Sequence, residues 1–313
     1  MTYSVFNHET YLDLEAARQE GQSEVFDLGA TGTVGLIARS IPQSDYHDLV
    51  SVYGYPDLSM GTAPIDIDLA LENLTSQARP RGHVAAYIRL GLSQQTPLPR
   101  VTALDYTAVR VDVGEVVAVD LASGPDATFA AYRKNLRNEL RRETGIKIER
   151  SNDFAAFHAI YTQNMLRVGA TGGYFFSEPY LRTLGELPGV ELWLAHDADG
   201  VVAGGMFITQ GDLTFYHLGA TADRALRASP LKNLLHSRIQ ALAGSGQRQL
   251  VLGGGVGGGD DPLLRFKRGF SKTMLPVHAL RVIVDHAKYT TLSGHPADAP
   301  LAAGFFPAYR APK

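Results

Sequence analysis

Residues 250–270 of this 313-residue chain read LVLGGGVGGGDDPLLRFKRGF. The apolar residues before the glycines predict a short strand over 249–252, and six of the seven residues from Gly253 to Gly259 are glycine. Asp261 followed by Pro262 is typical of a helix N-terminus, so we expect a helix from there through Phe270. A strand, a glycine-rich turn and a short helix therefore follow one another directly.

The glycine run is suited to backbone that lies close to a ligand. Gly253, Gly255 and Gly258 satisfy the spacing G-x-G-x-x-G, but a dinucleotide-binding unit needs further parallel strands after it. Only 54 residues follow Gly259, and Pro276 interrupts them. No Gly-Lys-Ser/Thr follows, which excludes a Walker phosphate loop. What remains is backbone rich in N–H donors that could hold a negative group or a peptide chain, with a merely flexible loop as the alternative.

Lys267 lies on the helix that follows the glycines. On a helix that begins at Pro262, Leu263, Phe266 and Phe270 share one face, which leaves Lys267 within a turn of the glycine run. An amine on a rigid helix beside such backbone can stabilise an oxyanion or transfer a proton. The alternative is a solvated surface lysine.

Composition excludes several classes of protein. The chain has no cysteine, so disulfides, thiolate metal sites, Fe–S clusters and cysteine nucleophiles are ruled out. Isolated histidines such as His158, His217 and His236 lack metal-ligand spacing, and Gly-x-Ser-x-Gly is absent, so we expect neither a metal nor a hydrolase elbow. No window approaches the roughly 18 apolar residues of a membrane span, and residues 1–21 contain neither the basic nor the apolar region of a signal peptide. We expect a cytoplasmic protein without an integral membrane segment.

Charge is distributed unevenly along the chain. The formal net charge is −3, but it is −9 over residues 1–125 and +6 over the remainder. Residues 133–150 read RKNLRNELRRETGIKIER, with Arg137 and Arg141 four positions apart. This spacing could place a basic stripe on a helix. The alternatives are contact with nucleic-acid phosphates and a solvated helix with internal ion pairs.

Hydrophobic periodicity predicts an α+β fold with mixed central sheets flanked by helices. The same kind of layout occurs twice, and we place the boundary between residues 1–148 and 149–313. The predicted elements of the first half are strands Val34–Ala38 and Val84–Leu92, helix Ile65–Gln77, a hairpin of Thr107–Val113 and Glu115–Leu121 around Gly114, one helix from Ala127 to Thr144, and strand Ile146–Glu149. The predicted elements of the second half are a helix ending near Arg167, a meander of Val190–His196, Val201–Thr209 and Leu213–Leu218, helix Ser229–Leu242, and, after the break at Pro276, strand Val277–Val284.

The strand, glycine run and F-K-x-G-F helix together resemble the C-terminal signature of the Fem-type aminoacyl-tRNA-dependent transferases. Val52-Tyr-Gly-Tyr55 is similar to the Y-G-Y turn of this family, and Tyr87-Ile-Arg89 to its aromatic-x-Arg strand. The basic helix of 133–150 is similar to the one leading into the family's second domain. The resemblance spans essentially the whole chain and implies two tandem acetyltransferase-like (GNAT) domains. The segment between 167 and 190 is too short for the coiled-coil arm of some members.

The resemblance also implies roles for individual residues. Phe266 and Lys267 correspond to the catalytic Phe-Lys pair, in which the lysine stabilises charge during attack on the aminoacyl ester. The residues expected to bind substrate are Tyr53, Tyr55, Arg89, Arg167, Tyr174, Tyr216, Gly253, Gly254 and Gly255. Those expected to bind tRNA are Arg133, Lys134, Arg137 and Arg141.

The resemblance thus implies an enzyme that moves an amino acid from aminoacyl-tRNA to the free amine of a peptide acceptor and forms an amide without a cofactor. The acceptor could be a cell-wall precursor, an intermediate of peptide-antibiotic assembly, or a peptide tethered to a carrier protein. One alternative is an acyl-CoA-dependent N-acyltransferase. Gly219–Ser229, however, lacks the Q/R-x-x-G-x-G/A turn that holds the CoA pyrophosphate, and Asp223 would repel phosphate. A non-catalytic GNAT-like module that binds peptides is a second alternative.

Overall fold

The computed structural model describes residues 4–56, 58, 66–92, 101–102, 106–255, 261–295, 301 and 303–311. Its internal contacts divide the chain into two compact units. Unit 1 comprises residues 1–114 and 276–313, and unit 2 comprises residues 115–275. These bounds differ from the predicted division after residue 148, because the last strand pairs with a strand from the first part of the chain. Local sequence patterns do not show such a long-range pairing.

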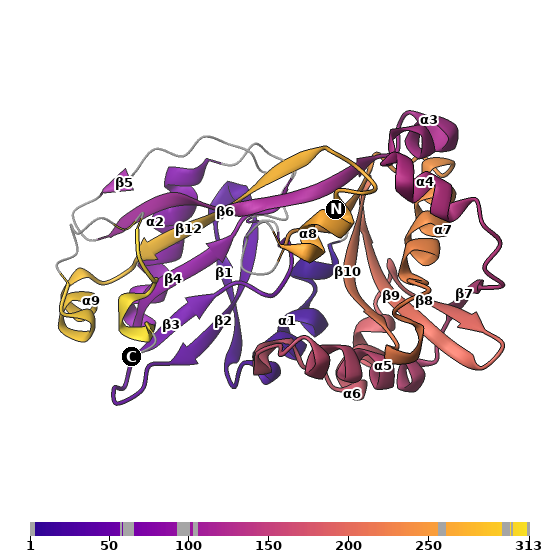
Figure 1. The fold of residues 1–313 in the computed structure, drawn as a ribbon. Coiled ribbons are helices and arrows are strands. Elements are labelled where there is room, and N and C mark those ends of the chain that lie inside the picture. Colours follow the sequence, from indigo (N-terminus) through magenta and orange to yellow (C-terminus); the bar gives the residue numbers. More distant parts are fainter. Residues whose placement is uncertain are drawn as a thin grey trace. The chain divides into compact units, whose positions relative to one another are not determined.

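The strands of unit 1 have the order β1-β2-β3-β4-β12 in a mixed sheet (Figure 1). The β3–β4 pair is parallel, and the other neighbours are antiparallel. Its elements are η1 (Val5–Asn7), α1 (Glu9–Arg18), β1 (Gln22–Asp27), η2 (Gly29–Thr31), β2 (Thr33–Ser40), β3 (His47–Val50), α2 (Ile67–Ala78), η3 (Arg79–Arg81), β4 (His83–Arg89), β5 (Val101–Thr102), α9 (His286–Ser293) and η7 (Ala308–Arg310). Strands β6 (Thr107–Asp120) and β12 (Met274–Ile283) contribute residues to both units.

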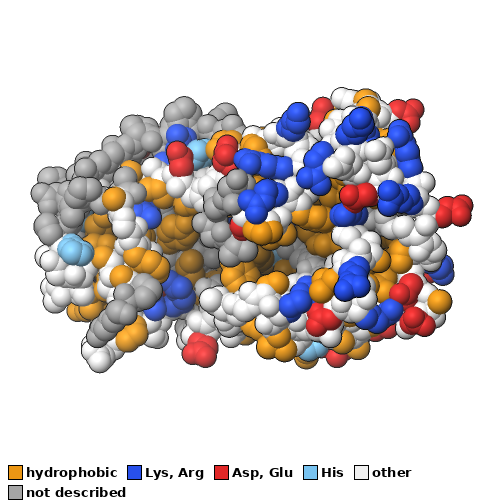
Figure 2. Space-filling model, viewed as in Figure 1, with side chains coloured by type: hydrophobic (Ala, Val, Ile, Leu, Met, Phe, Trp, Pro, Cys, Tyr) orange, Lys and Arg blue, Asp and Glu red, His pale blue; other side chains and the backbone are white. Residues whose placement is uncertain are grey.

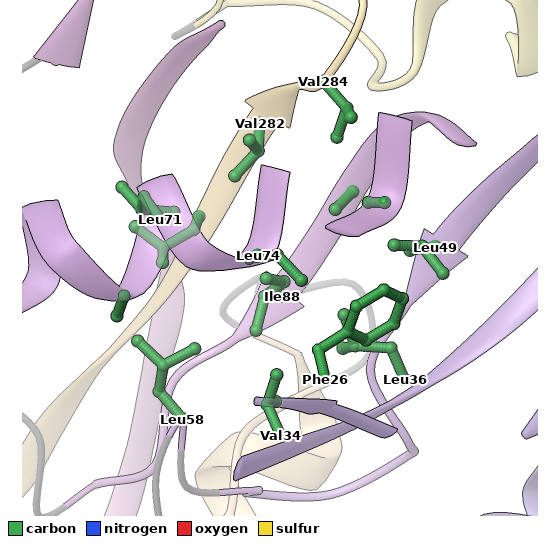
Figure 3. Packing of buried hydrophobic residues seen from close by; sticks show 14 of the residues in the cluster. Phe26, Val34, Leu36, Leu49, Leu58, Leu71, Leu74, Ile88, Val282 and Val284 are labelled. Carbon is green, nitrogen blue, oxygen red and sulfur yellow. The ribbon is translucent and has the colours of Figure 1, made fainter. Parts of the chain in front are cut away.

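Alternation along β2 explains how both faces of this sheet are covered. Val34 and Leu36 join a buried cluster with Leu71 and Leu74 of α2 (Figure 3). Gly35 points to the other face, where a Cβ would lie 2.8 Å from Leu12 of α1. Because successive strand residues face opposite sides, one strand packs against both helices.

The strands of unit 2 have the order β6-β11-β10-β9-β8-β7, and the β10–β11 pair is parallel. Helix α7 contributes Leu234, Leu235 and Ile239 to a buried cluster on one face, whereas α5 places Phe157 against Gly204 of β9. Its elements are α3 (Gly124–Ala131), α4 (Lys134–Leu140), β7 (Lys147–Ser151), α5 (Phe154–Arg167), η4 (Gly172–Tyr174), α6 (Glu178–Gly185), β8 (Val190–Asp197), β9 (Gly200–Gln210), β10 (Leu213–Thr221), η5 (Asp223–Ala225), α7 (Leu231–Ala243), β11 (Gln249–Gly253) and α8 (Pro262–Lys267). The α+β class and the β8–β10 meander are confirmed.

The predicted hairpin around Gly114 is wrong, because residues 107–120 form the single strand β6. Gly114 has a φ of 121°, which only glycine adopts easily, but the chain continues instead of reversing. The two halves of β6 have different partners: Thr107 pairs with β5, and Asp120 with β11. Tertiary pairing therefore overrides the local turn signal.

The predicted helix from Ala127 to Thr144 is also wrong, because it is divided into α3 and α4. Tyr132 is extended at the division, and the Arg133 N–H donates to the carbonyl of Gly269 instead of to the preceding turn. Pro276, expected to precede the last strand, lies within β12. The pairing of β12 with β4 begins at Ala279, so the missing N–H of Pro276 is tolerated there.

Asp48 connects the C-terminal residues to the body of unit 1. Its side chain is fully buried and pairs with Arg39 of β2 at 3.0 Å and with Arg310. Arg310 also donates to the carbonyl of Ser40 at 2.7 Å. One carboxylate thus neutralises two guanidinium groups that come from distant parts of the chain.

We expect Asp48→Ala to lower the free energy of unfolding by about 3–5 kcal/mol, because it leaves two arginines without their buried counter-charge. Chemical denaturation followed by circular dichroism measures this loss. Asp45→Ala is the control, because Asp45 is exposed, and it should stay within about 0.5 kcal/mol of the parent. Equal stability of both variants would contradict the structural role of Asp48.

Candidate active site

Strands β10 and β11 of unit 2 pair only at their beginnings. The parallel register runs from Leu213 opposite Gln249 to Phe215 opposite Val251 and then stops, although both strands continue. The register of β10 against β9 shifts between Tyr216 and Leu218, which marks a bulge. Bulges bend strands and occur often beside active sites. The two strands therefore separate next to Tyr216, and backbone beyond that point is not used in β10–β11 pairing.

The described part of the glycine run, Gly253–Gly255, lies at this separation. Gly253 has a φ of 85°, in the left-handed region that favours glycine. A Cβ on Gly254 would lie 2.8 Å from the carbonyl oxygen of Glu115, so the backbone approaches β6 closely. Residues 256–260, the remainder of the run, lie outside the described residues.

Lys267 is buried, with 7% of its surface exposed, and its Nζ donates to the carbonyl oxygen of Gly254 at 2.7 Å. The alternative of a solvated surface lysine is therefore wrong. Burial lowers the pKa of the Lys267 amine to about 8, and the nearby Asp261 carboxylate partly opposes this shift. Asp261 also caps α8, since its Oδ1 accepts from the Leu264 N–H at 2.8 Å. Helix α8 thus holds an amine whose pKa is close to neutral pH against the glycine backbone.

The buried face of α8 differs from the predicted one. Leu264 and Lys267 are buried, whereas Leu263 is 41% exposed. The helix ends at Lys267, so Phe270 lies beyond it. Phe266 is partly buried and contacts Phe270 edge-to-face, with ring centroids 5.7 Å apart. Phe266 therefore helps to fix the end of α8 against the core of unit 2.

Tyr216 lies on the bulged part of β10 and packs over glycines. Its hydroxyl occupies the place that a Cβ on Gly219 would take, and its ring lies 3.1 Å from the position of a Cβ on Gly205. The ring of Phe207 packs beside it, with centroids 5.6 Å apart. Burial raises the pKa of Tyr216, so it stays a neutral phenol that can donate a hydrogen bond.

Arg167 and Tyr174 are held by different partners in unit 2. Arg167 at the end of α5 forms an ion pair with Asp223 and hydrogen-bonds Asn164. Tyr174 is 46% exposed, and its carbonyl accepts from the Tyr161 hydroxyl at 2.9 Å. The pairing of Asp223 with Arg167 has no local sequence signal, because 56 residues separate the two.

The predicted tRNA-binding residues lie at the start of α4 and along it. Arg133, Lys134 and Arg141 are exposed and form no ion pair with any residue that the structure describes. Arg137 instead donates to the Ala130 carbonyl at 2.5 Å. Glu139 forms its ion pair with Lys232 of α7, at 2.5 Å. Figure 2 shows several Lys and Arg side chains over the region of α4 and α7.

Unit 1 brings Tyr53, Tyr55 and Arg89 close together. β3 and β4 are parallel neighbours, and the Y-G-Y turn follows the end of β3 while Arg89 ends β4. The Arg89 N–H donates to the Ser51 hydroxyl at 3.0 Å. Burial raises the pKa of Tyr55, an effect that neighbouring Tyr53 increases and Arg89 opposes.

Two residues that the sequence analysis missed hold the Y-G-Y turn. Buried Glu15 of α1 accepts from the Tyr53 N–H at 2.9 Å, and Tyr11 donates its hydroxyl hydrogen to the Tyr53 carbonyl at 2.8 Å. Gly54 has a φ of 114° and lies against the Phe6 ring, where no side chain fits. In the sequence, only the glycine between the two tyrosines indicates that a tight turn lies there.

Neither a metal cluster nor a membrane helix is found in the part of the chain that the structure describes. No three His, Asp or Glu side chains there are grouped so that they could hold a metal ion. No helix there is long and apolar enough to cross a membrane.

Comparison with known proteins defines the class of this fold. Residues 130–268 match the family model of the acetyltransferase (GNAT) domain. The chain therefore has a GNAT-type fold, in which the separated β10–β11 pair and α8 lie.

Three solved structures resemble the chain over most of its length. FemX is 11% identical, with 94% of this chain and 95% of FemX covered at a TM-score of 0.71. The C-terminal domain of a putative lysylphosphatidylglycerol synthetase from Agrobacterium fabrum is 13% identical, with 89% of each chain covered and a TM-score of 0.55. L-PGS from Bacillus licheniformis is 13% identical, with 90% and 93% covered and a TM-score of 0.54. A comparison with curated protein sequences found no match. The resemblance to Fem-type proteins is confirmed as one of fold.

We expect the Lys267 amine to titrate with a midpoint near 8, whereas exposed lysines titrate near 10.4. Labelling with [13Cε]lysine gives seven side-chain signals, and Lys267→Arg identifies the signal to follow. Unfolded protein binds this proton up to its ordinary pKa, so stability should rise between pH 8 and about 10.5. Asp261→Asn keeps the helix cap and should lower the midpoint further. A midpoint above 10 would contradict the buried environment.

Proposed function

We propose that this protein transfers an aminoacyl group from aminoacyl-tRNA to the amine of a peptide or amino-acid-containing acceptor. The observation that carries the proposal is the buried Lys267 held against the Gly254 carbonyl, at the separated strands of a GNAT-type fold that matches FemX over 94% of the chain. The resemblance of the F-K-x-G-F helix to the Fem-type signature supports it. A further structure of similar fold is that of a domain named for a putative lysylphosphatidylglycerol synthetase.

In this reaction the protein has to position the two substrates and stabilise the charge that develops on the carbonyl oxygen. The acceptor nitrogen attacks the ester carbonyl, the new C–N bond forms, and the ester C–O bond breaks, so that the tRNA hydroxyl leaves with a proton. The acceptor's own carboxylate or a tRNA ribose hydroxyl could take the proton that the amine loses. The Lys267 ammonium would stabilise the tetrahedral oxyanion, because a preorganised cation in a buried site is more effective than one in water. The Tyr216 phenol would donate a hydrogen bond to the same substrate.

Charge supports unit 2 as the part that binds tRNA. Unit 2 contains 18 Lys and Arg against 16 Asp and Glu, whereas unit 1 contains 11 against 16. The N–H of Arg133 donates to the Gly269 carbonyl, so α4 begins at the end of α8. Exposed Lys272 follows Gly269 by three residues, so it lies near the basic start of α4. Together these residues would contact phosphates near the tRNA acceptor end.

An acyl-CoA donor is the second candidate, because the matching family model is that of an acetyltransferase domain. The segment after β10, where such enzymes hold the pyrophosphate, argues against it in this chain. The Asp223 N–H donates to Gln163 at 3.1 Å, and Arg224 pairs with Asp197 at 2.7 Å. The N–H group and the cation that could receive phosphate are thus already engaged by the protein.

We expect Lys267→Met to lower kcat for transfer by about 10²–10³, because it removes the charge that stabilises the oxyanion. The assay incubates labelled aminoacyl-tRNAs with a panel of peptides, free and tethered to carrier protein, and measures amide product. In the parent, activity should fall as pH rises through about 8, and Lys267→Arg should shift this fall upward.

The control for this experiment is Lys288→Met, which removes a half-buried lysine of unit 1 and should leave kcat unchanged. Lys267→Met should remain folded, because it replaces a buried cation with an apolar side chain of similar length. Full turnover by Lys267→Met would remove Lys267 from the mechanism. Product from acetyl-CoA and none from aminoacyl-tRNA would favour the second candidate.

We expect the double variant Arg133→Gln/Lys134→Gln to bind tRNA more weakly and to lower the slope of log K against log salt by about 1–2. Filter binding over a range of salt concentrations measures both effects. Arg182→Gln on α6 is the matched control, because Arg182 is exposed and already pairs with Glu178 at 2.6 Å. An unchanged slope would exclude the start of α4 from the tRNA-binding surface.

A further inference from the structure

Arg89 of unit 1 is a half-buried cation without a compensating partner among the residues that the structure describes. Its backbone N–H donates to Ser51, but its guanidinium forms no hydrogen bond or ion pair with any residue that the structure describes. Other partly buried arginines of unit 1 are engaged: Arg39 and Arg310 share Asp48, and Arg281 donates to the Leu301 carbonyl. Partial burial of a guanidinium costs free energy unless a partner compensates it. The free guanidinium therefore points to a ligand.

Arg89 also lies at a place in the sheet where a ligand can bind. β3 and β4 are parallel, and both the Y-G-Y turn and Arg89 lie at their carboxyl ends. Ligands of open α/β sheets bind beyond the carboxyl ends of parallel strands, where loops diverge. Tyr55 lies close enough for the Arg89 charge to affect its phenol, and Glu15 and Tyr11 fix the turn that carries it. The turn is thus held by two hydrogen bonds to side chains of α1.

We infer that Arg89, with Tyr53 and Tyr55, forms a binding site for a carboxylate group on the ligand of unit 1. A single guanidinium binds a carboxylate through two parallel N–H···O bonds, and neutral phenols add donors beside it. The assignment of this carboxylate to the amine acceptor, as a peptide C-terminus or an acidic side chain, rests on the proposed aminoacyl transfer. The site itself does not depend on that reaction.

Charge favours a carboxylate over a phosphate or diphosphate. Unit 1 has five more acidic than basic residues, so its field opposes multiply charged anions. Arg89 supplies one positive charge to the site, which matches a monoanion. A diphosphate would need further cations, and the remaining partners of the site are tyrosines.

The test measures binding of N-acetyl-alanyl-alanine to the full-length protein by calorimetry, with its C-terminal amide as the matched ligand. Neither probe has a free amine, so neither can accept an aminoacyl group, and binding is read apart from transfer. We expect the acid to bind at least about tenfold more tightly than the amide, and Arg89→Gln to remove this preference. Arg89→Lys should restore only part of it, because an ammonium lacks the two-pronged geometry.

Arg81→Gln is the control variant, since Arg81 precedes the opposite end of β4 and pairs with Glu24 at 3.1 Å. It should bind the acid like the parent. Tyr55→Phe keeps the ring and removes one hydroxyl, so it should weaken acid binding and leave amide binding unchanged, and it tests the site if Arg89→Gln does not fold.

Several results would overturn the inference. These are equal binding of acid and amide, no binding of the acid up to about 10 mM, an unchanged preference in folded Arg89→Gln, or tighter binding of inorganic pyrophosphate than of the acid. Loss of aminoacyl transfer with a retained acid preference would instead refute the proposed function and leave the carboxylate site standing.

Discussion

The candidate active site depends on keeping a lysine amine out of water while its hydrogen bond is satisfied. Lowering the pKa of Lys267 from 10.5 to about 8 corresponds to about 3 kcal/mol against its charged form. The Gly254 carbonyl reduces this cost by accepting a hydrogen bond, and the charge of Asp261 reduces it further. The same Asp261 caps α8, so one side chain both stabilises the start of the helix and raises the pKa of the Lys267 amine.

This constraint explains why glycine is needed before α8. The carbonyl that accepts from Lys267 belongs to Gly254, and the backbone there lies so close to Glu115 that a side chain would collide with it. Gly253 must also adopt a positive φ as β11 ends. Gly253 and Gly254 therefore allow the backbone after β11 to lie close to β6. This requirement for glycine does not depend on a ligand.

The sequence predicted local elements well and long-range contacts poorly. The β8–β10 meander and α7 follow from alternating or helical apolar spacing, which acts within a few residues. Gly114 misled the prediction because β5 and β11 hold the two halves of β6 straight, and neither strand is adjacent in sequence. The helix after Ala127 divides because Arg133 bonds Gly269, 136 residues later.

The same limit applies to the candidate site. The glycine run and Lys267 could be found from their spacing, but the burial of the lysine could not, because α8 ends earlier and turns a different face inward than the periodicity implied. Long-range neighbours such as Asp223 beside Arg167 and Glu15 beside Tyr53 have no local signature. They change what each residue can do: an arginine that is already paired needs its partner displaced before it binds an anion, whereas Arg89 does not. The charge balance of the described contacts, and not the residue type alone, therefore separates arginines that hold the fold from arginines available to a substrate.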